Sequence, residues 1–162
     1  ELSPSDDFEI DFEIAFSDQA IGNQQHSLNM KNGSFVRELS DCRTFCMFSD
    51  VEYMKSIGLA LGGSLANAVV IDAGKVLNPE GYRREDECVR HKMLDALGDL
   101  ALAGMPVIGR YHGVKAGHHM TNLLLRAVFE ASDSFEIVEV NLRQSVQLPG
   151  VGLSYKDLEL AV

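Results

Sequence analysis

The sequence has no apolar run near the length that a membrane-spanning helix needs, which is about 18–20 residues. It has no excess of basic residues either: 14 Lys and Arg stand against 24 Asp and Glu, and the formal net charge is −10. An acidic chain gains little from a phosphate backbone, so nucleic-acid binding is disfavoured and a transmembrane segment is not expected. Hydrophobic residues make up 46% of the chain, which is enough for a folded core.

Cysteine is also scarce, with only Cys42, Cys46 and Cys88. An odd number of cysteines in a chain of this size does not support a disulfide framework, and it favours reduced thiols and a cytoplasmic location. Cys42 and Cys46 have a spacing close to half of a zinc finger, but no second cysteine pair exists to complete one. We therefore expect both to be small, buried, apolar residues.

The chain lacks an internal repeat, an initiator methionine and a signal peptide, since it begins Glu1-Leu2-Ser3-Pro4. These features predict a fragment or a processed product. We expect one α/β domain over residues 1–141 and a tail over residues 142–162.

Hydrophobic patterning predicts the elements of this domain. Residues 8–16 alternate apolar and polar side chains, which is typical of a strand with one wet face. The strongest helices are expected at residues 85–102 and 118–131. Further strands are expected at 43–48, 68–72, 75–77, 107–114 and 135–140, short helices at 34–40 and 51–57, and a loop ending in a hairpin at 18–33. The interspersed elements predict an α+β fold, a two-layer sandwich with two principal helices on one face of a mainly antiparallel sheet.

The helix at 85–102 carries the most informative polar residues. At 100° per residue, His91, Asp95 and Asp99 form a row opposite the apolar side, so His91 and Asp95 reach one point in space. A neutral imidazole and a carboxylate are both normal zinc ligands, and zinc activates water for hydrolysis. The same spacing is common on solvated helix faces, and taken alone it favours that simpler interpretation.

A second candidate lies at Gly117-His118-His119, beside Lys115. A histidine at a helix N-terminus can act as a general acid or base, and the positive end of the helix suits an anionic group. Taken alone, a surface histidine in a glycine-rich turn is again the more common explanation.

Several short motifs, taken together and in this order, are far more specific than either candidate. They are Arg43-Thr44-Phe45, Leu61-Gly62-Gly63-Ser64, Val76-Leu77-Asn78, the run from Asp86 to Leu100, and Lys115 with Gly117-His118. Over about residues 8–129 the chain resembles the UDP-3-O-acyl-N-acetylglucosamine deacetylases, which commit Gram-negative bacteria to lipid A synthesis.

The resemblance implies a role for each matching residue. His91 and Asp95 would be two of three ligands to Zn²⁺, although iron(II) suits the same ligand types. His118 would be the catalytic histidine, which protonates the leaving amine, and Asp99 would orient it. Thr44 would assist at the scissile carbonyl.

The resemblance also implies how the acylated UDP-N-acetylglucosamine substrate is held. Lys92 and Phe45 would contact its polar head and sugar. Residues 49–70 resemble an inserted βαβ unit that forms an apolar passage for the 3-O-acyl chain. Its candidate lining residues are Val51, Ala60, Gly63 and Ser64. An enzyme acting on such a lipid is compatible with transient contact with the inner membrane surface.

Departures from the family pattern limit what this chain is expected to do alone. The family enzymes have two similar halves, and the chain matches only the second. The third zinc-binding histidine and the general-base glutamate belong to the first half, in a Glu-His pair that this sequence lacks. Ala116, His119 and Thr121 also differ from the common pattern. We therefore expect weak zinc binding and almost no activity without the N-terminal domain.

Two other classes of function remain open at the level of sequence. One is a non-catalytic domain that binds a UDP-sugar, and the other is an interaction domain that docks a partner through its acidic surface. The preferred acyl length and the oligomeric state do not follow from the sequence.

Overall fold

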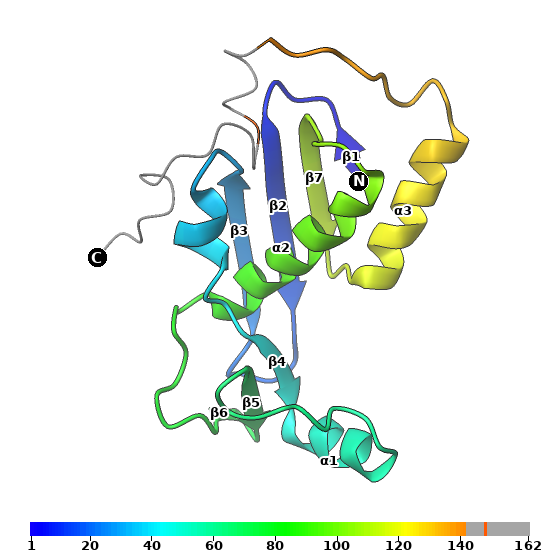
Figure 1. Ribbon diagram of the computed structural model, residues 1–162. Coiled ribbons are helices and arrows are strands. Elements are labelled where there is room, and N and C mark those ends of the chain that lie inside the picture. The colour runs from blue at the N-terminus through cyan, green and yellow to red at the C-terminus, as the bar shows by residue number, and fades with distance from the viewer. Residues whose placement is uncertain (142–147, 149–162) are drawn as a thin grey trace.

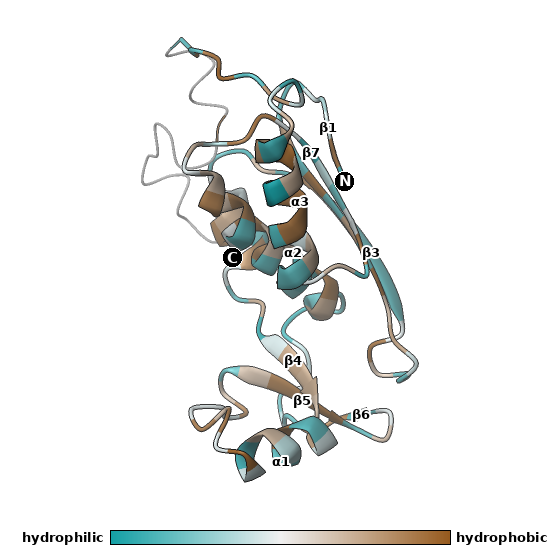
Figure 2. Cartoon of the chain, turned by 90° about the vertical axis from the view of Figure 1, so that its right-hand side faces the viewer, coloured by the Kyte–Doolittle hydropathy of each residue, from teal (hydrophilic) through white to brown (hydrophobic). Residues whose placement is uncertain are grey.

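The larger part of the fold is a four-stranded sheet with two helices on one face. The computed structural model describes residues 1–141 and 148. Figure 1 shows α2 (Glu87–Leu100) and α3 (His118–Glu130) in front of this sheet, and the side view in Figure 2 places both on the same side of it. The strands, in spatial order, are β1 (Leu2–Ser3), β7 (Gly109–Val114), β2 (Phe8–Ala15) and β3 (Asn23–Asn29). The predicted α+β class with two principal helices on one face is confirmed.

The strand pairing makes this sheet mixed rather than purely antiparallel. The two outer pairs, β1–β7 and β2–β3, are antiparallel, as expected for most of the sheet. The central pair, β2 and β7, is parallel. A parallel pair needs a crossover connection, and the chain between these two strands includes α2.

The core lies between β2 and α2. Along β2 the apolar residues at every second position are buried, while the acidic residues between them are half-buried or exposed. On α2 the predicted apolar side faces this layer, and all but Leu97 of its five residues are buried: Val89, Met93, Ala96 and Leu100. Burying one such large side chain contributes roughly 1.5–3 kcal/mol. One side of α2 is thus fixed by packing, and its polar row is turned away from the sheet.

A smaller layer stands apart from the larger sheet, below it in Figure 1. Its sheet has the order β4-β5-β6, and β4 runs parallel to β5. Helix α1 connects these two strands, which is the expected βαβ unit. The elements are β4 (Thr44–Met47), α1 (Phe48–Ser56), β5 (Ala68–Asp72) and β6 (Lys75–Val76).

Two sequence predictions about strands were wrong. Residues 18–33 contain the strand β3. Its sequence has no apolar alternation, and main-chain pairing with β2 along its whole length holds it in place instead. Residues 135–140 form no strand, and none of the strands in the described part of the chain pairs with this exposed segment. The short β1 was not predicted. The helix expected at 34–40 is a five-residue π-helical turn, Phe35–Leu39. The predicted tail lies outside the described residues, apart from residue 148.

A pair of glycine substitutions tests the core packing. A Cβ at Gly113 in β7 would lie 2.7 Å from Cε2 of Phe12 and 2.9 Å from Cε1 of Tyr111, and both rings are buried. Gly113→Ala is therefore expected to lower the free energy of unfolding by about 1–3 kcal/mol, as overpacking does. The matched control is Gly98→Ala in α2, where a Cβ would meet nothing within 4 Å. There alanine should raise the free energy of unfolding by roughly 0.5–1 kcal/mol, since glycine is a poor helix former. Urea denaturation monitored by circular dichroism measures both, and equal effects would contradict this packing.

Candidate metal and catalytic site

The polar row of α2 is where the structure gathers the predicted site residues. His91 and Asp95 lie one turn apart, with 3.3 Å between His91 Nε2 and Asp95 Oδ1. Both side chains are largely shielded from solvent, with exposed fractions of 14% and 18%. The predicted juxtaposition of an imidazole and a carboxylate is therefore present in the structure.

The second nitrogen of His91 fixes which tautomer the ring adopts. His91 Nδ1 lies 3.2 Å from the backbone carbonyl oxygen of Cys42. A carbonyl oxygen can only accept, so Nδ1 carries the hydrogen and donates it. In a neutral ring Nε2 then has a lone pair, which points at the negatively charged carboxylate of Asp95. Two acceptors at this distance repel each other unless a cation, either a proton or a metal ion, lies between them.

The donor set fits zinc. A tetrahedral site with Zn–N and Zn–O bonds of about 2.1 Å places two ligand atoms roughly 3.4 Å apart. The observed separation of 3.3 Å between His91 Nε2 and Asp95 Oδ1 agrees with this value. A backbone carbonyl that accepts from the far ring nitrogen is the usual support for a metal-binding histidine. Within residues 1–141 and 148, no group of three His, Cys, Asp or Glu side chains converges as a metal site.

Helix α3 brings a second histidine to the same row. His118 is the first residue of α3, and its Nδ1 lies 2.9 and 3.0 Å from the two carboxylate oxygens of Asp99. The carboxylate fixes Nδ1 as the donor, so Nε2 is the nitrogen left to exchange a proton. This Nε2 lies 3.9 Å from Asp95 Oδ1, and the His118 side chain is 69% exposed. The arrangement is an oriented imidazole at the edge of the His91–Asp95 pair.

Lys92 and Phe45 complete the surroundings of the pair. Lys92 Nζ donates to Asp95 Oδ2 at 2.5 Å. The Phe45 ring meets the His91 ring edge-on, with centroids 6.5 Å apart, and packs in the same way on Phe16 at 5.4 Å. Burial raises the pKa of Asp95, but contacts with Lys92 and, when its Nε2 carries a proton, with His91 outweigh it and lower the pKa to about 2. Asp95 is therefore a charged carboxylate at neutral pH.

The remaining predicted residues belong to the smaller layer. Thr44 is exposed at the start of β4, next to Phe45. Val51 is half-buried in α1, whereas Ala60, Gly63 and Ser64 are exposed in the segment between α1 and β5. No described cavity is lined by any of these four, so their role as a passage for an acyl chain stays a prediction.

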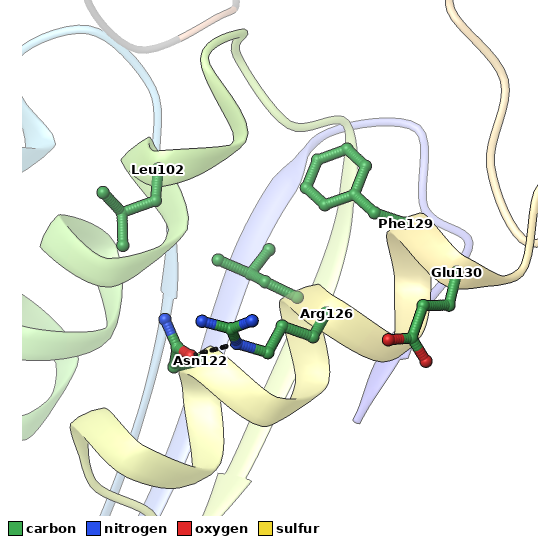
Figure 3. Close-up of a pocket in the computed structure, with 6 residues that line it drawn as sticks. Leu102, Asn122, Arg126, Phe129 and Glu130 are labelled. Atoms are coloured by element: carbon green, nitrogen blue, oxygen red, sulfur yellow. Dashed lines mark hydrogen bonds between the residues drawn. The ribbon is translucent and has the colours of Figure 1, made fainter.

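Two cavities of the molecule lie elsewhere. One, of about 350 Å³, lies between Leu102, just after α2, and the C-terminal part of α3, where Arg126 donates to Asn122 at 2.8 Å (Figure 3). The other, of about 310 Å³, lies between the end of α2 and residues 104–107. Neither is lined by His91, Asp95 or His118. The candidate site is therefore marked by the His91–Asp95 and His118–Asp99 pairs and not by a cavity.

The comparison with known sequences identifies the family. The sequence profile of the LpxC family, UDP-3-O-acyl N-acetylglycosamine deacetylase, matches residues 1–130. The chain belongs to this family. A UDP-3-O-acyl-N-acetylglucosamine deacetylase of Phenylobacterium zucineum is 52% identical over 136 residues, covering 84% of the chain and 46% of the relative.

Other deacetylases of the same name show the same partial coverage. The protein of Nitratiruptor sp. is 46% identical over 86% of the chain and 47% of its own length, and that of Haemophilus influenzae is 45% identical over 90% and 48%. The chain thus spans about half the length of the curated relatives it matches. In the described part of the chain, no helix is long and apolar enough to span a membrane.

The lowered pKa of Asp95 makes stability depend on pH in the metal-free chain. Its folded pKa of about 2 lies below the ordinary value of 3.8. Folding therefore favours the charged carboxylate by roughly 2–3 kcal/mol. This contribution is full above about pH 5 and is lost as the pH falls through 3.8 towards 2.

Denaturation with EDTA present, between about pH 5 and pH 2, measures this dependence. Asp95→Asn should flatten the fall in unfolding free energy, while Asp72→Asn, at the exposed end of β5, serves as the control for removing one carboxylate. An unchanged slope in Asp95→Asn would contradict the assigned contacts.

Proposed function

We propose that the chain is the C-terminal half of a zinc-dependent deacetylase of lipid A synthesis. The reaction removes the N-acetyl group from UDP-3-O-acyl-N-acetylglucosamine in the cytoplasm and gives acetate and the free amine. The supporting observation is the pair of acceptors, His91 Nε2 and Asp95 Oδ1, held at the separation of two zinc ligands. A proton alone would relieve their repulsion but would not explain why the oriented His118 stands beside them.

Each residue of the cluster has a defined task in this proposal. His91 and Asp95 bind zinc, which when bound lowers the pKa of a water molecule and polarises the substrate carbonyl. His118 donates a proton from Nε2 to the departing amine, and Asp99 holds its ring in the required tautomer. Thr44 stabilises the developing oxyanion. Lys92 and Phe45 contact the sugar and its polar head, and Val51, Ala60, Gly63 and Ser64 border the acyl chain.

A contribution from a second domain would explain why two candidate metal ligands, rather than three, meet among the described residues. Catalytic zinc sites usually have three protein ligands and an open position for water. The third ligand and the base that takes the proton from water would come from an N-terminal domain, as the family resemblance implies. The chain alone is then an incomplete site, with weak metal binding and negligible turnover.

Zinc binding by this chain tests the metal assignment. Isothermal titration calorimetry should show one weak site per chain, and His91→Ala should abolish it because one of two ligands is lost. His112→Ala is the matched control, since His112 lies on β7 and contacts Glu13 instead. Equal zinc binding by wild type and His91→Ala would refute the site. Robust deacetylation by the chain alone would refute the division of roles between the halves.

The role of His118 is tested in the complete enzyme, with the N-terminal half present. His118→Ala should lower kcat by about 10²–10⁴-fold with little change in KM, since proton donation acts in the transition state. Steady-state kinetics on the acylated UDP-sugar measure both constants, with the adjacent His119→Ala as control. A large rise in KM with unchanged kcat would move His118 to a binding role.

A further inference from the structure

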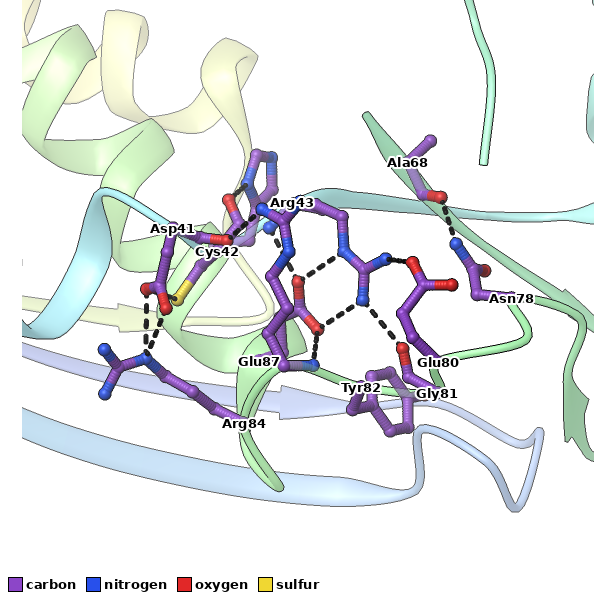
Figure 4. A network of polar contacts seen from close by, with 12 residues as sticks. Asp41, Cys42, Arg43, Ala68, Asn78, Glu80, Gly81, Tyr82, Arg84 and Glu87 are labelled. Atoms are coloured by element: carbon purple, nitrogen blue, oxygen red, sulfur yellow. Dashed lines mark hydrogen bonds and ion pairs between the residues drawn. The ribbon is translucent and has the colours of Figure 1, made fainter. Parts of the chain in front are cut away.

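A buried ion pair between Arg43 and Glu87 joins the smaller layer to the first turn of α2, one turn before His91 (Figure 4). The side chains of Arg43 and Glu87 are 2% and 0% exposed, and Arg43 Nε donates to Glu87 Oε1 at 2.9 Å. Arg43 Nη2 donates to Glu87 Oε2 at 3.1 Å, so the guanidinium grips the carboxylate with two bonds. The same guanidinium donates to Glu80 and to the carbonyl of Gly81.

The backbone of Arg43 connects this ion pair to the site. Its N–H donates to Glu87 Oε1 at 2.9 Å, and that N–H belongs to the same peptide group as the carbonyl of Cys42. The Cys42 carbonyl in turn accepts from His91 Nδ1 at 3.2 Å. A trans peptide is planar, with its N–H and C=O pointing in opposite directions. One rigid peptide group is therefore held at one end by Glu87 and at the other by His91.

The spacing of Glu87 and His91 along α2 lets both side chains reach this one peptide group. Glu87 and His91 are four residues apart, so they lie on the same side of the helix, one turn from each other. Glu87 Oε2 also accepts from the backbone N–H of Arg83 at 2.7 Å, which leaves the carboxylate little freedom to rotate. Burial raises the pKa of Glu87, but the hydrogen bonds from Arg43 and Arg83 outweigh it, and the group stays charged.

We propose that Glu87 and Arg43 are positioning residues that hold the Cys42–Arg43 peptide group so that its carbonyl fixes His91 with Nε2 facing Asp95. The inference rests on the proposed metal site for its catalytic meaning, while the positioning itself is independent of metal. The same peptide begins the segment that carries Thr44 and Phe45. The Arg43–Glu87 ion pair and this peptide group, together called the clamp, therefore place His91, Thr44 and Phe45. A merely structural tie between the smaller layer and α2 would stabilise the fold without setting His91.

Nuclear magnetic resonance of the metal-free chain tests the positioning. The signal to follow is the hydrogen on Nδ1 of His91, which is compared in all variants at one pH. In wild type this hydrogen should give a signal protected from solvent exchange, because Cys42 accepts it. Glu87→Gln should lose the protection, since an amide NH₂ cannot accept from Arg43 or Arg83. Backbone amides of β2 report whether the fold is retained.

Two further variants keep the test decisive. Arg43→Lys retains the charge and the backbone N–H but removes the two guanidinium bonds to Glu87. It should also lose the protection of the His91 Nδ1 hydrogen, and it decides the question if Glu87→Gln does not fold. Ile10→Val, in the core strand β2, loses stability without touching the clamp and should keep the His91 signal. Persistence of the signal in the folded Glu87 and Arg43 variants would overturn the proposal.

Zinc titration of the same variants separates this inference from the proposed function. Their zinc affinity should fall about 10–100-fold relative to Ile10→Val, as is typical when the support of a metal-binding histidine is removed. Unchanged zinc affinity in folded variants would overturn the positioning role. A protected His91 signal in a wild-type chain that binds no zinc would refute the metal site and leave the clamp intact.

Discussion

The unsatisfied meeting of two acceptors, His91 Nε2 and Asp95 Oδ1, is the constraint around which the rest of the site is organised. Neither atom can be relieved by rotation, because Nδ1 of His91 is engaged by Cys42 and the other carboxylate oxygen of Asp95 by Lys92. A buried arrangement of this kind costs free energy unless a cation is supplied. The geometry is completed when a proton or a metal ion lies between the two atoms.

Helix α2 serves both the core and the site because its two sides face different surroundings. The apolar side packs on β2, which fixes the rotation of the helix about its axis. The polar row then meets β4 from the smaller layer and α3 from the larger one. Contacts from two separate parts of the chain converge on one row of this helix, at Glu87, His91 and Asp99.

Much of the frame was predictable from the sequence because it depends on periodicity. The alternation in β2 and the apolar side of α2 predicted their burial correctly, and the spacing of His91, Asp95 and Asp99 predicted one polar row. The strand β3 was missed because its stability comes from main-chain hydrogen bonds that leave no apolar pattern. The segment at 135–140 has the composition of a strand, but a strand also needs a neighbour.

The supporting contacts of the site were harder to predict than its ligands. The partner of His91 is a backbone carbonyl, which every residue carries, so no letter of the sequence marks it. Arg43 and Glu87 were visible as members of family motifs, but their burial and mutual contact depend on how the smaller layer folds back onto α2.

The edges of the larger sheet have a consequence for how the chain behaves in contact with other copies of itself. One edge is β1, only two residues long, and the other is β3, whose sequence Asn-Gln-Gln-His-Ser-Leu-Asn is almost wholly polar. Short or polar borders are poor templates for the addition of strands from another molecule. Fibrous self-association through these borders is therefore disfavoured, and the sheet keeps its own strand order when chains meet at high concentration.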